Sequence, residues 1–167
     1  MIDNSKNEVE EIINKYSSMV YKLIYCHIQI KSYVDDIFQE VFLKYIKYNK
    51  PFTNEEHRKA WIIRVTINCC YSLNSSSWLK KTVTLEDNLY EHIDEKTDNK
   101  IDMQRLLLKI PEKYRTVIHL FYYEDLSVEQ ISFILKIKPS TVRTQLTRAR
   151  AMLKDLMEGE DDFERKG

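Results

Sequence analysis

Five residues near the C-terminal end of the chain could contact nucleic acid. At 100° per residue of an α-helix, they lie on the side opposite Val142 and Leu146. Hydroxyl side chains between guanidinium groups let a helix lie deep in a DNA major groove, where Arg contacts guanine edges or phosphates. The alternative is a basic helix that contacts only solvent. The five residues are Ser140, Arg143, Thr144, Thr147 and Arg148.

Two short helices with a tight break between them would position this face. Ser127 is predicted to be the N-cap of the first helix, and Gln130 completes a capping box with it. Pro139 is predicted to begin the second helix, which carries the basic residues. The three-residue turn from Lys136 to Lys138 makes this a helix-turn-helix arrangement, and its geometry favours a DNA reader over a solvated surface.

Two further helices are predicted before this motif. The first is short and precedes Pro111, and the second starts at Pro111. The first four of the apolar positions below define the short helix, and the last four are predicted to be buried by the second. These positions are Met103, Leu106, Leu107, Ile110, Tyr114, Val117, Ile118 and Phe121.

An acidic and polar edge runs along residues 35–46, beside aromatic side chains. It consists of Asp35, Asp36, Gln39 and Glu40. Composition alone favours a solvated helix face here. A catalytic carboxylate pair or a metal site fits less well, because no base, His or third carboxylate lies at a matching spacing.

A second polar pair lies in residues 60–73. Arg64 and Asn68 are four residues apart, so they share one face of the predicted helix. Asn is mildly unfavourable inside a helix, which suggests a specific role. That role is either a surface hydrogen bond or a contact to a base or phosphate.

Three amphipathic helices are predicted in the N-terminal part. The first covers residues 8–29, and the second opens at a capping box of Ser32 and Asp35 and ends near Pro51. Thr53 and Glu56 form the capping box of the third. The inward positions of the second are predicted to be Val34, Ile37, Phe38, Val41, Phe42, Tyr45 and Ile46. Those of the third are Ala60, Trp61, Ile63, Ile67 and Cys70.

Composition excludes several classes of protein. The two glycines, Gly159 and Gly167, cannot build a phosphate-cradling glycine-rich loop, and two glycines with three prolines favour long helices. No apolar run has membrane-spanning length, and the polar N-terminus does not resemble a signal peptide, so we expect a cytoplasmic protein without membrane insertion. The three cysteines are interpreted as buried thiols, with no metal or other cofactor expected.

Charge is unevenly distributed although the chain is neutral overall. Residues 1–74 carry a net charge of +1, residues 75–104 carry −3, residues 105–157 carry +5 and residues 158–167 carry −3. This pattern predicts two domains and a linker. Together with the predicted helices, it indicates an all-α protein with two small helical domains joined by a flexible linker. The predicted boundaries are 1–74, a linker at 75–100, the helix-turn-helix domain at 101–157 and an acidic tail at 158–167.

These segments together resemble a known family, the small two-domain extracytoplasmic-function group of the bacterial sigma-70 factors. The string DDIFQEVFLKYI at 35–46 resembles that family's polymerase-clamp-binding helix, and AWIIRVTIN at 60–68 resembles its promoter-melting segment. The string IPEKYRTVIHLFYYEDLSVEQISFILKIKPSTVRTQLTRARAML at 110–153 resembles its C-terminal domain. The resemblance covers residues 9–74 and 101–157.

The resemblance implies a role for each group of residues. The clamp of core RNA polymerase would be bound by Asp35, Asp36, Phe38, Gln39 and Glu40. The minus-ten promoter element would be contacted by Arg64 and Asn68, with Trp61 in the core. The minus-thirty-five element would be read by the face of 140–148 that carries Ser140, Arg143, Thr144, Thr147 and Arg148.

Two residues depart from the family's usual pattern. Lys136 stands where the family usually has Gly, in a turn expected to need a left-handed backbone. Lys138 replaces the usual Ser N-cap, so the recognition helix would depend on Pro139 for its start.

The sequence is therefore interpreted as a non-catalytic sigma factor whose partners are core RNA polymerase, promoter DNA and, where one exists, an anti-sigma factor. The alternative is a free-standing helix-turn-helix regulator that uses residues 1–74 for dimerisation or ligand binding. A regulator of that kind binds its operator alone, whereas a sigma factor needs the core enzyme.

Overall fold

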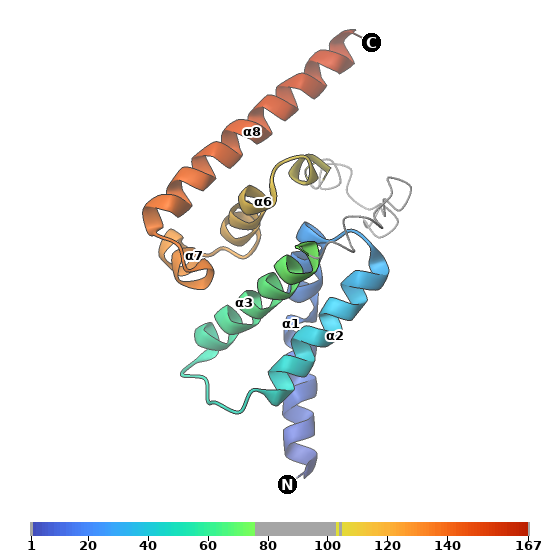
Figure 1. Ribbon diagram of the computed structural model, residues 1–167, viewed down its shortest axis with the longest axis vertical. Coiled ribbons are helices and arrows are strands. Elements are labelled where there is room, and N and C mark those ends of the chain that lie inside the picture. The colour runs from blue at the N-terminus through green and yellow to red at the C-terminus, as the bar shows by residue number, and fades with distance from the viewer. Residues whose placement is uncertain (1, 76–102, 104, 167) are drawn as a thin grey trace. The chain divides into compact units, whose positions relative to one another are not determined.

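The computed structural model describes residues 2–75, 103 and 105–166, and every regular element within them is a helix (Figure 1). The chain divides into two compact units, Met1–Tyr90 and Glu91–Gly167. The all-α fold predicted from the sequence is confirmed. Apart from Ser75, the predicted linker at 75–100 lies outside the described residues, so the exact domain boundaries stay a prediction.

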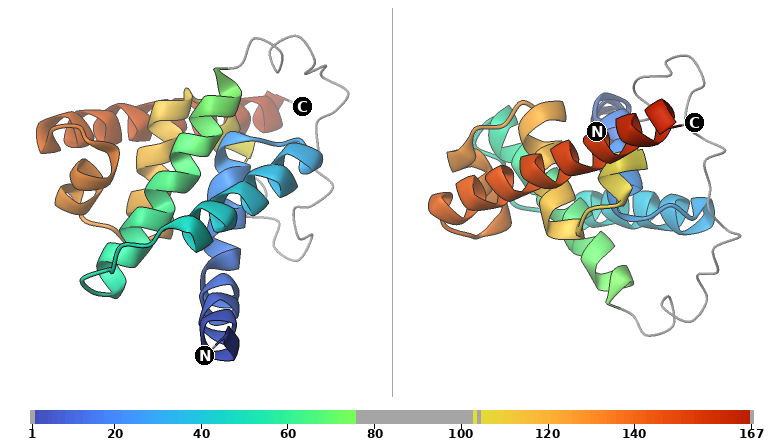
Figure 2. Two further views of the ribbon diagram at one scale, coloured as in Figure 1. Left: turned by 60° about the horizontal axis from the view of Figure 1, so that its bottom comes forward. Right: turned by 90° about the horizontal axis from the view of Figure 1, so that it is seen from above.

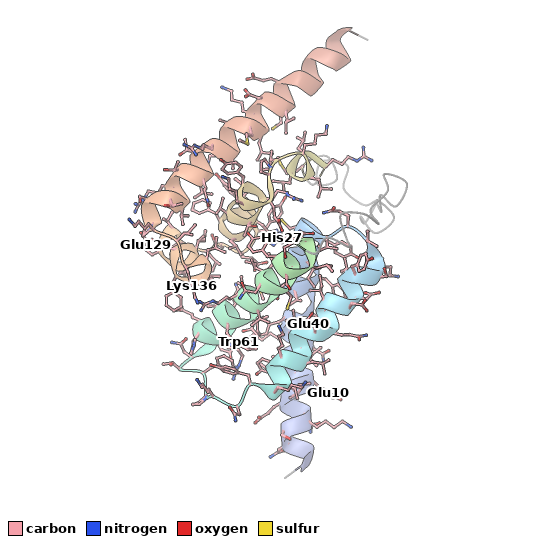
Figure 3. The ribbon with its side chains drawn as sticks, viewed as in Figure 1. Glu10, His27, Glu40, Trp61, Glu129 and Lys136 are labelled. Carbon is pink, nitrogen blue, oxygen red and sulfur yellow. The ribbon has the colours of Figure 1, made fainter. Side chains whose placement is uncertain are left out.

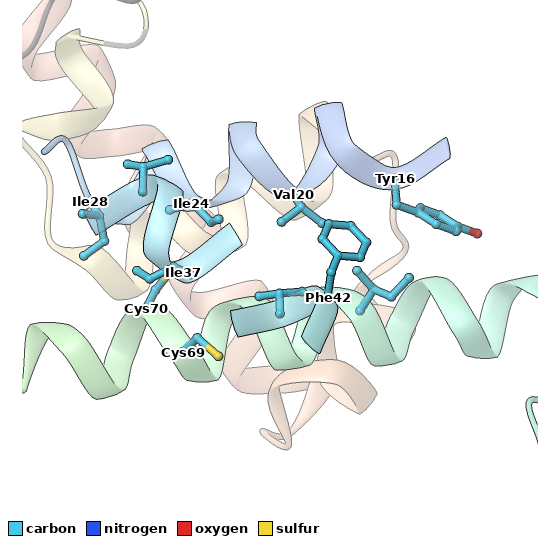
Figure 4. Packing of buried hydrophobic residues seen from close by; sticks show 11 residues of the cluster. Tyr16, Val20, Ile24, Ile28, Ile37, Phe42, Cys69 and Cys70 are labelled. Atoms are coloured by element: carbon cyan, nitrogen blue, oxygen red, sulfur yellow. The ribbon is translucent and has the colours of Figure 1, made fainter. Parts of the chain in front are cut away.

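The first unit is a bundle of three helices, α1 (Ile2–His27), α2 (Lys31–Lys47) and α3 (Glu55–Asn74). Each helix packs against the other two (Figure 2). The core between them consists of apolar side chains that recur at three-to-four spacing, which gives each helix one buried stripe (Figure 4). Its buried members are Tyr16, Val20, Ile24, Ile28, Val34, Ile37, Val41, Phe42, Ile62, Cys69 and Cys70.

The ends of α2 and α3 differ from the sequence prediction. Ile30, not Ser32, is the N-cap of α2, and no side chain caps it. The helix starts at Lys31, so Ser32 is already inside the first turn and the predicted capping box is wrong. In α3 the N-cap is Asn54, whose Oδ1 accepts a hydrogen bond from the backbone N–H of His57 at 2.8 Å. Thr53 lies one residue too early for that role.

A cluster of aromatic side chains lies where the loop between α2 and α3 packs on α3. Trp61 has ring centroids of Tyr48, Phe52 and Tyr45 at 4.7, 5.8 and 5.9 Å. Trp61 is half-buried, so it belongs to the edge of the core and not to its centre. These rings fix the loop that joins the two helices.

The second unit consists of a short helix at 105–108, α6 (Glu112–Ile118), a π-helical turn η3 (His119–Tyr123), α7 (Val128–Leu135) and α8 (Pro139–Lys166). Both α6 and α7 pack against α8 (Figure 1). Pro111 is the N-cap of α6, one position before the first turn predicted for it. The predicted acidic tail at 158–167 continues the backbone of α8 as far as Lys166.

The helix-turn-helix is formed by α7 and α8. The capping box predicted for α7 is confirmed, because the Ser127 hydroxyl accepts from the Gln130 N–H and the Gln130 side chain accepts from the Ser127 N–H. The left-handed backbone expected at Lys136 is also confirmed, with φ 56° and ψ 42°. As predicted, α8 starts at Pro139.

Candidate nucleic-acid interface

The face of α8 predicted to contact DNA is exposed along its whole length. Val142, Leu146 and Ala149 are buried on the opposite side, against α6 and α7. The periodicity of the sequence therefore predicted which side of this helix reaches solvent. The exposed residues are Ser140, Arg143, Thr144, Thr147 and Arg148.

The two threonines present hydrogen-bond acceptors to the outside. The Thr144 hydroxyl donates to the Ser140 carbonyl and the Thr147 hydroxyl donates to the Arg143 carbonyl, both at 3.0 Å. With their protons used inside the helix, these oxygens can accept from the amino groups of cytosine or adenine, and the methyl groups can contact thymine. Side chains of this kind suit a helix lying in the major groove.

Arg143 and Arg148 of α8 differ in the contacts that their side chains make within the protein. Arg143 Nη2 lies 3.5 Å from Glu129 Oε1 of α7, and both side chains are exposed, so this ion pair is weak. Tyr114 is buried, and Arg148 donates a hydrogen bond to its hydroxyl. This bond lowers the pKa of the Tyr114 hydroxyl. Arg143 is thus the more available of the two for DNA.

Arg150, on the same helix, serves a structural purpose. Its Nε donates to the Tyr122 hydroxyl at 2.7 Å, and its guanidinium lies 5.6 Å from the ring centroids of Phe121 and Tyr122. These contacts tie α8 to the π-helical turn. Arg150 carries the same charge as Arg143 and Arg148, but its contacts are to aromatic residues of the protein.

The polar pair on α3 lies on the outside of the first unit. Asn68 is exposed and Arg64 is half-buried. Ile63 and Ile67, which each precede one of these residues in the chain, are buried in the core. Arg64 and Asn68 therefore share a face that can receive a ligand, while their neighbours fix the helix beneath them.

The polar edge predicted on α2 is divided by the fold. Asp36, Gln39 and Glu40 are exposed, but Asp35 is half-buried and faces α1. Burial raises the pKa of the Tyr21 hydroxyl, and a hydrogen bond with Asp35 raises it further. Phe38 points inward, stacked on Tyr21 with 4.1 Å between ring centroids. Only part of the predicted set is thus directly available to a partner.

Glu40 is exposed, and its side chain also interacts with groups of α2 and α3. Its Oε1 is 3.3 Å from Lys44 Nζ, and both groups interact with the buried thiol of Cys69 on α3. Burial raises the pKa of the Cys69 thiol, and the negative charge of Glu40 raises it further. Glu40 therefore connects the outside of α2 to its packing on α3.

Two apolar residues on α2 were not recognised as part of the exposed surface. Leu43 is 54% exposed and Ile46 is 55% exposed. The prediction that Ile46 points inward is wrong, because a residue seven positions after Gln39 lies close to the same side of the helix. Asp36, Gln39, Leu43 and Ile46 form one strip, here named the outer α2 face. Strict application of the helical period would have found it.

The other classes of site considered from the sequence find no support in the described structure. Cys69 and Cys70 are buried, and Cys26 is half-buried. Among the described residues, no group of three or more His, Cys, Asp or Glu side chains could hold a metal ion. In the described part of the chain, no helix is both long and apolar enough to span a bilayer.

A capped helix-turn-helix that presents an exposed basic helix defines the second unit as a DNA-binding module. Comparison with known families supports this. Residues 100–153 match the family model described as Sigma-70, region 4.

Curated relatives extend the match to most of the chain. RNA polymerase sigma factor SigZ of Bacillus subtilis is 26% identical over 156 residues, which cover 90% of this chain and 88% of SigZ. ECF RNA polymerase sigma factor SigW of the same organism is 27% identical over 160 residues, 86% of each chain. Over most of its length the chain is therefore similar to extracytoplasmic-function sigma factors, and its second unit is similar to region 4 of the sigma-70 family.

A solved structure shows the same fold. The sigma factor RpoE from Bartonella quintana, determined in complex with the anti-sigma factor NepR, matches with a TM-score of 0.72 and 16% identity. The match covers 90% of this chain and 97% of that one. Together with the curated relatives, this supports a sigma factor and not a free-standing helix-turn-helix regulator.

Proposed function

We propose that this sigma factor directs core RNA polymerase to promoters through three separate surfaces, one on each of α2, α3 and α8. It would act in the cytoplasm as a specificity subunit, with no catalytic chemistry of its own. The observation that carries the proposal is the exposed basic face of α8 in a unit matched by the sigma-70 region 4 model. The other two surfaces follow from the geometry of the first unit.

The outer α2 face is proposed to bind the polymerase clamp. Asp36 and Gln39 supply charge and hydrogen bonds, and the exposed Leu43 and Ile46 supply apolar area beside them. A strip that combines exposed aliphatic side chains with charges is typical of a protein interface. Glu40, which is exposed beside this strip, would supply a second carboxylate to the interface. Asp35 and Phe38 would support the face through their contacts with Tyr21 of α1.

The face of α3 that carries Arg64 and Asn68 is proposed to act at the minus-ten element. The Asn68 amide offers both donors and an acceptor to the edge of an unpaired base. The Arg64 guanidinium can contact a phosphate or stack on a base. These groups would hold promoter DNA once it opens, after polymerase has been captured.

The exposed face of α8 is proposed to read the minus-thirty-five element. Arg143 would contact a guanine edge or a phosphate, and Thr144 and Thr147 would accept hydrogen bonds from bases. Arg143 and Arg148 flank this face in helical projection, and Ser140 lies between them. An anti-sigma factor is a candidate regulatory partner, since the Bartonella quintana neighbour was solved with one bound.

Run-off transcription with purified core polymerase tests the proposal. We expect specific transcripts only when core enzyme and this protein are both present. Binding of promoter DNA by the protein alone should be weak, because one helix with few cations supplies little affinity. Tight operator binding without core enzyme, together with no stimulation of transcription, would contradict the proposed function.

A further inference from the structure

The turn between α7 and α8 contains a lysine in a conformation that favours glycine. Lys136 has φ 56° and ψ 42°, and Asp125 is the other non-glycine residue in the described chain with a positive φ. A Cβ atom makes the left-handed region costly, and glycine is the residue that adopts it most easily. The lysine side chain at this position therefore lowers the stability of the folded protein relative to glycine.

Ser132 holds this conformation in place. Its carbonyl accepts hydrogen bonds from the backbone N–H of both Lys136 and Ile137, the latter at 3.2 Å. Its hydroxyl donates to the Ile137 carbonyl at 2.5 Å. This is the bonding pattern of a helix ended by a left-handed residue, with a side-chain bond added. One serine thus fixes the turn that aims the recognition helix.

The lysine itself points its charge toward solvent at the DNA-reading end of the unit. Lys136 is exposed and ends α7, and Lys138 and the start of α8 follow at once (Figure 3). Residues 130–154 contain no acidic side chain. In a helix-turn-helix, the first helix crosses the DNA backbone while the second enters the groove. The turn between them is then close to the phosphates.

We propose that Lys136 contacts a backbone phosphate of promoter DNA and that Ser132 is the positioning residue that holds it there. This inference rests on the proposed reading of promoter DNA by α8. The ligand group is a phosphate of duplex DNA, so the contact is independent of base sequence. The turn gains a cation at a position where glycine would make the free protein more stable.

This assignment has a signature that a purely structural residue lacks. Replacing Lys136 with glycine relieves the backbone but removes the charge, so stability and DNA affinity change in opposite directions. A residue that only supports the fold would change both in the same direction. The conservative variant Lys136→Arg keeps the charge and the Cβ, and should resemble the wild type in both measurements.

The experiment compares Lys136→Gly, Lys136→Arg and the control Lys113→Gln, which removes an exposed cation from α6. Promoter affinity of the reconstituted holoenzyme is measured at about 50 and about 200 mM salt, and thermal unfolding of the full chain is measured alone. Lys136→Gly should raise the unfolding midpoint by about 4 °C. It should weaken promoter binding by roughly three- to tenfold and reduce the salt slope by about 0.9. The control should leave affinity and slope unchanged.

Ser132→Ala tests the positioning role. In the wild-type background, Ser132→Ala should lower the unfolding midpoint. In the Lys136→Gly background the same change should lower the midpoint less, because glycine adopts the left-handed conformation without the Ser132 hydrogen bond. Equal losses in the two backgrounds would show that Ser132 does not hold the lysine.

Other outcomes separate this inference from the proposed function. If Lys136→Gly keeps wild-type affinity and salt slope while Arg143→Ala loses affinity, the phosphate contact is wrong and promoter reading stands. If Lys136→Gly is both less stable and weaker in binding, the residue is structural. If the wild-type holoenzyme does not prefer promoter DNA over random duplex, the proposed function fails and the phosphate contact fails with it.

Discussion

The two helical units differ in how their proposed functional residues are distributed over the helices. In the second unit, the residues proposed to read DNA lie within 140–148 on a single helix whose start and buried side are fixed locally. In the first unit, the proposed surfaces lie on α2 and α3, and which side chains are free depends on packing between three helices. A local site can be recognised from periodicity and caps, whereas a site spread over packed helices depends on tertiary contacts.

The largest effect is expected on the first unit. The double variant Asp36→Lys/Glu40→Lys should weaken core polymerase binding by roughly 100-fold, because it reverses two charges at a proposed interface. A pull-down of core enzyme with purified variant measures this. Glu8→Lys/Glu11→Lys makes the same change of charge on exposed positions of α1 and should bind normally. Undiminished binding by the folded Asp36/Glu40 variant would exclude α2 as the clamp-binding surface.

A smaller effect, confined to one kinetic step, is expected on α3. Asn68→Ala should slow open-complex formation about tenfold while leaving polymerase binding intact, because one base contact is worth about 1–3 kcal/mol. Permanganate footprinting over time measures opening on a natural promoter. Glu56→Gln, an exposed change on a different side of α3, is the matched control. Wild-type opening by Asn68→Ala would show that this face has no part in melting.

The arginines of α8 should separate into two kinds. Arg143→Ala should reduce the discrimination between bases in the upstream promoter element by about 1–2 kcal/mol. Its ion pair with Glu129 is exposed and weak, so the Arg143 side chain is available to DNA. Arg148→Ala should also lower stability, since Arg148 interacts with Tyr114. Transcription from promoters randomised upstream, with thermal unfolding of each variant, measures both. Lys154→Ala is the control. The distinction would be contradicted if Arg143→Ala and Arg148→Ala had the same base preference and stability, or if either variant behaved like Lys154→Ala.

The smallest effect tests which residue caps α3. Asn54→Ala should lower the free energy of unfolding by about 1 kcal/mol, because Asn54 accepts the His57 N–H hydrogen bond. Thr53→Ala should change it by only a few tenths of that amount, although the sequence pattern favours Thr53. Urea unfolding of both variants decides between them. A larger loss for Thr53→Ala would restore the cap predicted from the sequence.

Periodicity and capping signals were sufficient to predict most of the second unit. The Ser127 cap, the left-handed Lys136 and the exposed face of α8 all depend on interactions within a few residues. In the first unit, the sequence could not show that Asp35 interacts with Tyr21, because these residues are on different helices. The errors at Ser32 and Thr53 have a related cause, since several polar residues near each helix start could serve as caps and local preference does not choose among them.

The length of α7 has a consequence for how the protein folds. Eight residues are too few to form a stable helix in water, since isolated helices shorter than about 12–15 residues are marginal. This helix therefore exists only while it packs on α8 and the π-helical turn. Amide protons in α7 should then exchange with solvent mainly when the whole unit opens. Competence to read DNA would appear and disappear as a single cooperative event, with no long-lived state in which the recognition helix is formed but wrongly aimed.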